Sequence, residues 1–108
     1  MIIHESDIEA DFLTIVLANG YALCTVYGDE DKESGVAWLA NVKVRPLFRG
    51  QGYGNRLIKQ ALKLARERGY KKMQLAAIPG WRVDWYKRCG FVVINENYCG
   101  RVIMEQAL

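Results

Sequence analysis

The sequence predicts an α/β fold of the α+β kind, with a mixed and mostly antiparallel sheet and two helices. Three observations carry this prediction: paired β-branched runs in the first half, two helical segments in the second half, and a short apolar strand between those helices. A strand, a helix and a strand in succession imply a right-handed crossover and one parallel strand pair. The runs joined by short connections imply antiparallel pairs.

The early strands begin with a predicted hairpin. Apolar runs at Phe12 to Ala18 and Tyr21 to Tyr27 flank Asn19-Gly20, and both residues of this step accept the positive φ that a two-residue hairpin turn requires. A third run at Gly35 to Val44 follows a charged loop and alternates with a period of two. We expect one face of this third strand to carry Val36, Trp38, Ala40, Val42 and Val44.

The later elements are two helices and three strands. An amphipathic helix over residues 53–68 ends before Gly69, which suits a C-cap, and its apolar stripe comprises Leu57, Ile58, Ala61, Leu62 and Ala65. The other elements are expected at Lys72 to Ile78 (strand), Trp81 to Cys89 (helix stopped by Gly90), and Phe91 to Asn95 and Arg101 to Gln106 (strands joined by residues 96–100).

Length and composition restrict the class of protein. We expect 108 residues, 51% of them hydrophobic, to form a single domain over residues 1–108, and a small core leaves a stabilising homodimer open. A net charge of +3 suits an anionic ligand but argues against nucleic acid, which needs clustered charge. The three cysteines form no C-x-x-C pair, and the sequence shows no signal peptide. No apolar run comes near the roughly 20 residues of a membrane span, so we expect a cytoplasmic protein.

The segment Val42 to Ile58 joins a strand to a helix through a glycine-rich turn. Unpaired N–H groups and the macrodipole make a helix start attractive to anions, and alternate glycines let the backbone approach a phosphate. The segment is not a P-loop, because Asn55 and Arg56 occupy the positions of the lysine and the serine or threonine. The glycine spacing also differs from the dinucleotide fingerprint G-x-G-x-x-G.

Two motifs together resemble the GNAT superfamily of N-acetyltransferases. Arg49, Gly52 and Gly54 satisfy its pyrophosphate-binding pattern R/Q-x-x-G-x-G/A, which many loops meet by chance. Residues 85–91, W-Y-K-R-C-G-F, are similar to the family's F-Y-x-x-x-G-F segment, and Tyr86 follows the glycines at the distance that the family's helix and strand require. The resemblance runs from the third strand to the C-terminus and implies the acyl-CoA N-acyltransferase fold, here without most of its N-terminal helical region.

The resemblance implies transfer of acetyl from acetyl-CoA to an amine acceptor, either a protein or a small molecule, without a metal. The turn would hold the pyrophosphate of CoA, the third strand would pair with the pantetheine arm, and Tyr86 would be the general acid beside the thioester sulfur. The implied cofactor-binding residues are Val42, Lys43, Val44, Arg49, Gly50, Gln51, Gly52, Tyr53 and Gly54.

The chemistry gives each implied role a purpose. An amine of pKa about 10 must lose a proton before it attacks, and a strand N–H near Val42 could stabilise the charge that develops on the carbonyl oxygen. The leaving thiolate, whose thiol has a pKa near 8.5, benefits from a proton supplied by a phenol of pKa about 10. No residue stands out as the general base.

The sequence departs from the family pattern at two places. Only eleven residues, Met1 to Asp11, precede the first predicted strand, where the family has one strand and two helices that shape the acceptor pocket. Pro79 lies near the family's CoA-contacting asparagine, although Trp81 could pack on the cofactor instead. The alternative function is therefore a CoA-binding sensor or regulatory module with weak catalysis, and a nucleic-acid-binding protein using the basic helix is third.

Overall fold

The computed structural model describes residues 2–5, 12–17, 22–46, 49–50 and 52–108. These residues form seven strands and two helices. The strands are β1 (Ile2–Glu5), β2 (Phe12–Leu17), β3 (Ala22–Gly28), β4 (Val36–Val44), β5 (Lys72–Ala77), β6 (Val92–Tyr98) and β7 (Arg101–Ala107), and the helices are α1 (Tyr53–Glu67) and α2 (Trp81–Arg88).

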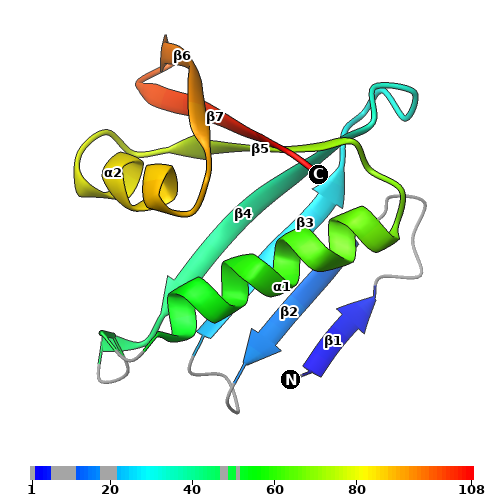
Figure 1. Ribbon diagram of the computed structural model, residues 1–108, viewed down its shortest axis with the longest axis horizontal. Helices are drawn as coiled ribbons and strands as arrows, with labels where there is room; N and C mark the ends of the chain where they lie inside the picture. Colours follow the sequence, from blue (N-terminus) through cyan, green and yellow to red (C-terminus); the bar gives the residue numbers. More distant parts are fainter. Residues whose placement is uncertain (1, 6–11, 18–21, 47–48, 51) are drawn as a thin grey trace.

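One sheet contains all the described strands, in the order β1-β2-β3-β4-β5-β7-β6. The pair β4–β5 is parallel, and every other neighbouring pair is antiparallel. The prediction of a mixed, mostly antiparallel sheet with two helices is therefore confirmed (Figure 1). The turn predicted at Asn19-Gly20 lies outside the described residues, but the antiparallel pairing of β2 with β3 is as predicted.

Strand β1 is an element that the sequence pattern did not predict. Its register along β2 runs from Ile2↔Val16 to Glu5↔Leu13. The four residues I-I-H-E are too few for a period of two to be recognised. This segment forms a strand because it pairs with β2, and local sequence propensity does not predict such pairing.

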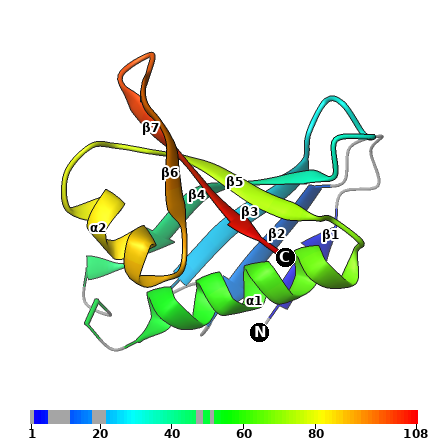
Figure 2. The same ribbon diagram turned by 45° about the horizontal axis from the view of Figure 1, so that its top comes forward.

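Helix α1 lies across β2, β3 and β4, as Figure 2 shows from a second direction. The predicted apolar stripe packs inward, with Leu57, Ile58, Ala61 and Ala65 buried. The core around them includes alternate residues of β3, β5 and β7 and also Tyr86 of α2, so both helices cover the same face of the sheet. Neither described helix is long and apolar enough to cross a membrane.

Helix α1 ends at the glycine that the sequence predicts. Gly69 has a left-handed φ of 86°, and its N–H donates to the carbonyl of Arg66. The next N–H, of Tyr70, donates to the carbonyl of Ala65 at 3.1 Å. These two bonds form a Schellman motif, which satisfies carbonyls that the last turn would otherwise leave unpaired.

A bulge in β4 changes the faces of that strand. Asn41 adopts a left-handed φ of 54°, which asparagine tolerates better than most residues, and the β3–β4 register shifts nearby. The core-facing residues are consequently Ala37 and Leu39 before the bulge and Val42 and Val44 after it. The sequence prediction that Val36, Trp38, Ala40, Val42 and Val44 share one face is therefore wrong, because the extra residue reverses the alternation.

The β6–β7 hairpin has a tighter connection than the sequence predicts. Cys99 and Gly100 have φ of 52° and 78°, and Tyr98 pairs with Arg101 across them. Positive φ at both central residues is typical of a type I′ turn, whose twist matches the flanking strands. The predicted five-residue loop over residues 96–100 is wrong, because β6 continues to Tyr98.

Candidate active site

The site begins where β4 and β5 separate. These parallel strands pair at four positions, from Val36↔Lys72 to Leu39↔Leu75, and then diverge (Figure 1). Beyond the last pair, a cavity of about 780 Å³ is lined by Val42 to Val44 at the end of β4 and by Ile78, which directly follows β5. This volume is in the ordinary range for a site that binds a small molecule or a cofactor.

The glycine turn forms one end of the cavity. Gly50 and Gly52 have left-handed φ of 77° and 83°, and a Cβ at either position would meet no described atom within 4 Å. Backbone conformation, and not crowding by the protein, therefore favours glycine here. Gly52 is the N-cap of α1; no described side chain caps it, and the first turn contains no acidic residue. The amides of this turn have no acceptor inside the helix, so they are available to an anion.

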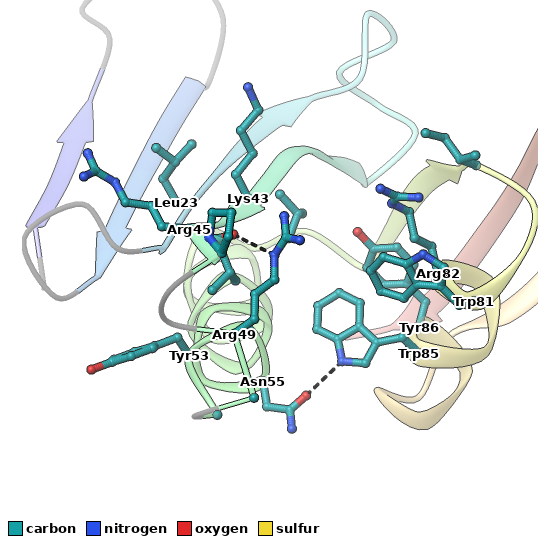
Figure 3. Close-up of a pocket in the computed structure, with 17 residues that line it drawn as sticks. Leu23, Lys43, Arg45, Arg49, Tyr53, Asn55, Trp81, Arg82, Trp85 and Tyr86 are labelled. Atoms are coloured by element: carbon teal, nitrogen blue, oxygen red, sulfur yellow. Dashed lines mark hydrogen bonds between the residues drawn. The ribbon is translucent and has the colours of Figure 1, made fainter.

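The side chains around the turn are basic. Lys43, Arg45, Arg49 and Arg82 line the cavity, and no carboxylate does so in the described part of the chain. Figure 3 shows Arg49 between the walls, with its Nε donating to the Val44 carbonyl at 3.1 Å. This bond keeps a positive charge beside the helix start, and the combination suits a ligand that carries phosphate groups.

Tyr86 lies on the opposite wall, on the last turns of α2. Gly90, with φ 99°, follows the C-cap of that helix, and the Phe91 N–H donates to the Tyr86 carbonyl at 3.0 Å. The closure brings the Phe91 ring edge-on to the Tyr86 ring, with centroids 5.8 Å apart. The Gly-Phe step of the sequence motif thus has a physical role, because it fixes the position of the tyrosine.

The phenol of Tyr86 is held in its protonated form. The residue is only 8% exposed, yet it lines the cavity. Burial raises the pKa of Tyr86 to about 12, and Cys89 and Cys24 act in the same direction. Near neutral pH the phenol carries its proton, so it can donate a proton or a hydrogen bond and is not present as a phenolate base.

Trp85 connects the two walls of the cavity. Its indole N–H donates to the Asn55 side-chain oxygen at 3.2 Å (Figure 3). A Cβ at Gly54 would lie 3.0 Å from the same ring, so this glycine allows α1 and α2 to approach each other. Neither Asn55 nor Trp85 is among the site residues predicted from the sequence, because residues so far apart along the chain carry no signal of their contact.

The mouth of the cavity is apolar and exposed. Ile78 and Trp81 line it and are 43% and 66% exposed, and the Arg82 guanidinium lies 4.6 Å from the centre of the Trp81 ring. Large apolar side chains at the edge of a cavity are typical of a ligand contact. Trp81 therefore offers a flat surface at the place where the sequence analysis considered cofactor packing.

The structure brings the predicted site residues together around this one cavity. Gln51 lies outside the described residues. All the other predicted site residues line the cavity: Tyr86, Val42, Lys43, Val44, Arg49, Gly50, Gly52, Tyr53 and Gly54.

The sequence matches one protein family and one curated relative. The profile of the acetyltransferase (GNAT) family matches residues 7–91. A thialysine N-epsilon-acetyltransferase from Bos taurus is 35% identical over 51 residues, which make up 47% of this chain and 27% of that protein. The chain therefore matches little more than a quarter of that relative's length.

Solved structures of acetyltransferases share the fold. The PaiA N-acetyltransferase from Thermoplasma acidophilum, in complex with coenzyme A, has a TM-score of 0.76 at 17% identity, with 94% of this chain and 63% of that chain covered. A Bacillus subtilis acetyltransferase in complex with CoA has a TM-score of 0.71 at 13% identity, with 92% and 77% covered. At these identities the likeness concerns the fold.

Proposed function

Since the chain belongs to the acetyltransferase (GNAT) family, we propose that it is an N-acetyltransferase that moves an acetyl group from acetyl-CoA directly to an amine. One observation carries the proposal: the same cavity joins a basic helix N-terminus to a buried, protonated tyrosine. We propose further that residues 1–108 form one such domain and act in the cytoplasm.

The cavity suits acetyl-CoA in charge and in shape. The amides of the first turn of α1, with Gly52 and Arg49, would hold the phosphates. Lys43 and Val44 pair with β3 along one edge of β4, and the stretch from Val42 to Val44 lines the cavity, so it can bind the extended amide-bearing arm as an added strand would bind. Acetyl-CoA supplies an acetyl group activated as a thioester, whose C–S bond breaks as the C–N bond to the amine forms.

Tyr86 Oη is the group that holds a proton for the departing sulfur. Its pKa of about 12 lies above the roughly 8.5 of a thiol, so donation is uphill unless Oη regains a proton in the same step. The acceptor nitrogen must lose a proton as it becomes an amide, so it is the natural source. Tyr86 therefore acts as a relay from nitrogen to sulfur as well as an acid.

The acceptor is proposed to be a primary alkyl amine. The curated relative is named for acetylation at an Nε position of thialysine, and the family profile agrees with an amine acceptor. We call the cavity that holds the turn and Tyr86 the donor cavity. An alkylammonium ion must first be deprotonated, and no carboxylate lines the donor cavity among the described residues. Water is consequently the base that this site offers, and turnover should rise with pH toward the amine pKa of about 10.

The lack of a carboxylate in the described lining also favours a second candidate, a CoA-binding sensor or regulatory module with weak catalysis. Such a protein would bind acetyl-CoA and CoA equally well and would release CoA thiol no faster with an amine than without one. The rate of CoA-thiol release with and without an amine therefore distinguishes the two functions.

Calorimetric titration and a thiol-release assay test the proposal. We expect acetyl-CoA and CoA to bind and ATP to bind far more weakly, and we expect primary amines to accelerate release of CoA thiol. Tyr86→Phe should lower turnover by roughly ten- to a thousandfold and leave CoA affinity nearly unchanged, because only the proton is removed. Binding without amine-dependent thiol release would favour the sensor, and the absence of binding would exclude both functions.

A further inference from the structure

A second cavity is lined by side chains from four strands of the sheet. Its volume is about 340 Å³, and it is lined by Tyr27 of β3, Trp38 of β4, Tyr98 of β6 and Ile103 of β7. Three of these side chains are aromatic, and the roles proposed above for the first cavity use none of them. We call this second space the aromatic cavity.

Side-chain alternation places the aromatic cavity on the face of the sheet opposite the helices. Tyr27 follows Val26, Trp38 follows Ala37, and both of these preceding residues belong to the core under the helices. Because successive side chains of a strand point to opposite faces, Tyr27 and Trp38 point away from α1 and α2.

The aromatic cavity adjoins the point where β4 and β5 separate. Trp38 precedes the last β4–β5 pair, Leu39↔Leu75, by one residue. Ile103 pairs with Ala76, the first β5 residue beyond that pair. Ala76 is exposed although β5 is an interior strand, so this part of the sheet is open. Trp38 and Ile103 therefore lie within one strand position of the separation, on the face opposite the buried tyrosine of α2.

The donor cavity also reaches the helix-free face. Lys43 and its cross-strand partner Leu23 both line it. These two residues alternate with Val44 and Ala22, which pack toward the core. The donor cavity is thus lined in part by residues of the helix-free face, on which the aromatic cavity also lies.

An acidic loop adjoins the aromatic cavity. Asp29 Oδ1 accepts the Trp38 indole N–H at 2.9 Å, and this hydrogen bond holds the pKa of Asp29 below its ordinary value. The loop over residues 29–33 carries four carboxylates and one lysine, in a chain whose net charge is +3. Four basic side chains line the donor cavity, whereas the aromatic cavity has an uncharged lining and the Asp29 carboxylate beside it.

We propose that the aromatic cavity binds the amine acceptor in its protonated form, as a primary alkylammonium ion. The faces of Tyr and Trp rings attract cations, the Asp29 carboxylate adds to the attraction, and Ile103 offers an apolar contact for a methylene chain. This inference rests on the proposed acetyl transfer, because that reaction makes an amine the expected second ligand. The inference adds the site at which the acceptor binds and the charge that the acceptor carries there.

Binding is measured without CoA, so that the result does not depend on the transfer reaction. The probes are 1,5-diaminopentane, which is charged near neutral pH, and 1,5-pentanediol, which has the same length and no charge. We follow the Trp38 indole N–H by NMR and expect a saturable shift with the diamine and at least tenfold weaker binding of the diol. Equal binding of the two probes, or shifts confined to Trp81 and Trp85, would overturn the proposal.

A pair of variants on β6 tests the location. Tyr98 is 59% exposed and Ile94 is 49% exposed, so neither truncation should disturb folding, but only Tyr98 lines the cavity. Tyr98→Ala should weaken diamine binding about three- to tenfold, while Ile94→Ala should leave it unchanged.

The kinetic readout separates this inference from the proposed function. In acetyl transfer, Tyr98→Ala should raise KM for the amine by about three- to tenfold and leave KM for acetyl-CoA unaltered. Unchanged amine KM in that variant would overturn the cavity assignment while transfer itself stands. Charge-dependent diamine binding in a protein that transfers no acetyl group would support the cavity as a cation site and refute the transferase.

Discussion

Gly52 and Gly69 form a matched pair at the two ends of α1. Their φ values are 83° and 86°, and at both positions an added Cβ would meet no described atom within 4 Å. Alanine at either site therefore introduces the same left-handed strain, about 1–2 kcal/mol, without a collision. For a domain of roughly 100 residues, each kcal/mol lowers Tm by about 4–8 °C.

The two variants should be equal in stability and unequal in ligand binding. The new methyl group of Gly52→Ala would project into open space beside the first-turn amides, where we propose that the phosphates bind. The other site is at the far end of a 15-residue helix, roughly 22 Å away at 1.5 Å per residue. We expect CoA affinity to fall at least tenfold in Gly52→Ala, about 1.4 kcal/mol, and to stay at the wild-type value in Gly69→Ala.

Thermal unfolding by circular dichroism and calorimetric titration with CoA, well below both Tm values, provide the two measurements. Equal CoA affinity in Gly52→Ala and Gly69→Ala would refute the assignment of the turn to the phosphates. Tm values that differ widely between the two variants would instead refute the strain argument, because that argument depends only on φ and on empty space around the Cβ.

Two further predictions concern stability and the connection between the helices. Burial raises the pKa of Cys24 from its ordinary 9.0 to about 12, so its contribution to stability is full below pH 9 and is lost as the pH rises from 9 toward 12. Urea unfolding should therefore show that the free energy of unfolding falls less between pH 8 and pH 10 in Cys24→Ala than in the wild type, whereas the exposed Cys99→Ala should lose as much as the wild type. Identical pH dependence in the wild type and Cys24→Ala would contradict this. Trp85→Phe and Asn55→Ala each remove one partner of the 3.2 Å hydrogen bond and should lower stability by about 0.5–1.5 kcal/mol and weaken CoA binding several-fold. Combined, they should do little more than either alone, whereas additive effects would show that the bond does not couple the two walls.

The contiguous part of the candidate site could be predicted from local sequence. The stretch from Val42 to Gly54 reads as strand, glycine turn and helix, and each of these states depends on near neighbours. The structure shows α1 beginning at Tyr53, as that pattern predicts, and it adds that Gly50 and Gly52 have positive φ. The position of Tyr86 beside this turn came from a resemblance between motifs and not from spacing alone.

Contacts between distant segments could not be predicted in this way. The bulge at Asn41 leaves no mark in the alternation of its neighbours, so the faces of β4 were assigned wrongly. The hydrogen bond between Asn55 and Trp85 joins two helices that are separated by a strand. Nothing in either local segment distinguishes these side chains from ordinary helix residues.

By itself the sequence determined the order of elements from β2 onward, the ends of the helices, and the anion-attracting turn, because periodicity, capping and glycine conformations act over a few residues. Tertiary structure alone decided that β4 and β5 pair over four positions and then separate, and that Tyr86 lines the same cavity as the turn. It also decided that the aromatic cavity gathers side chains of four strands on the face of the sheet opposite the helices. These features depend on strand register and on packing between segments that lie far apart in the chain, and a register is chosen by the whole sheet at once.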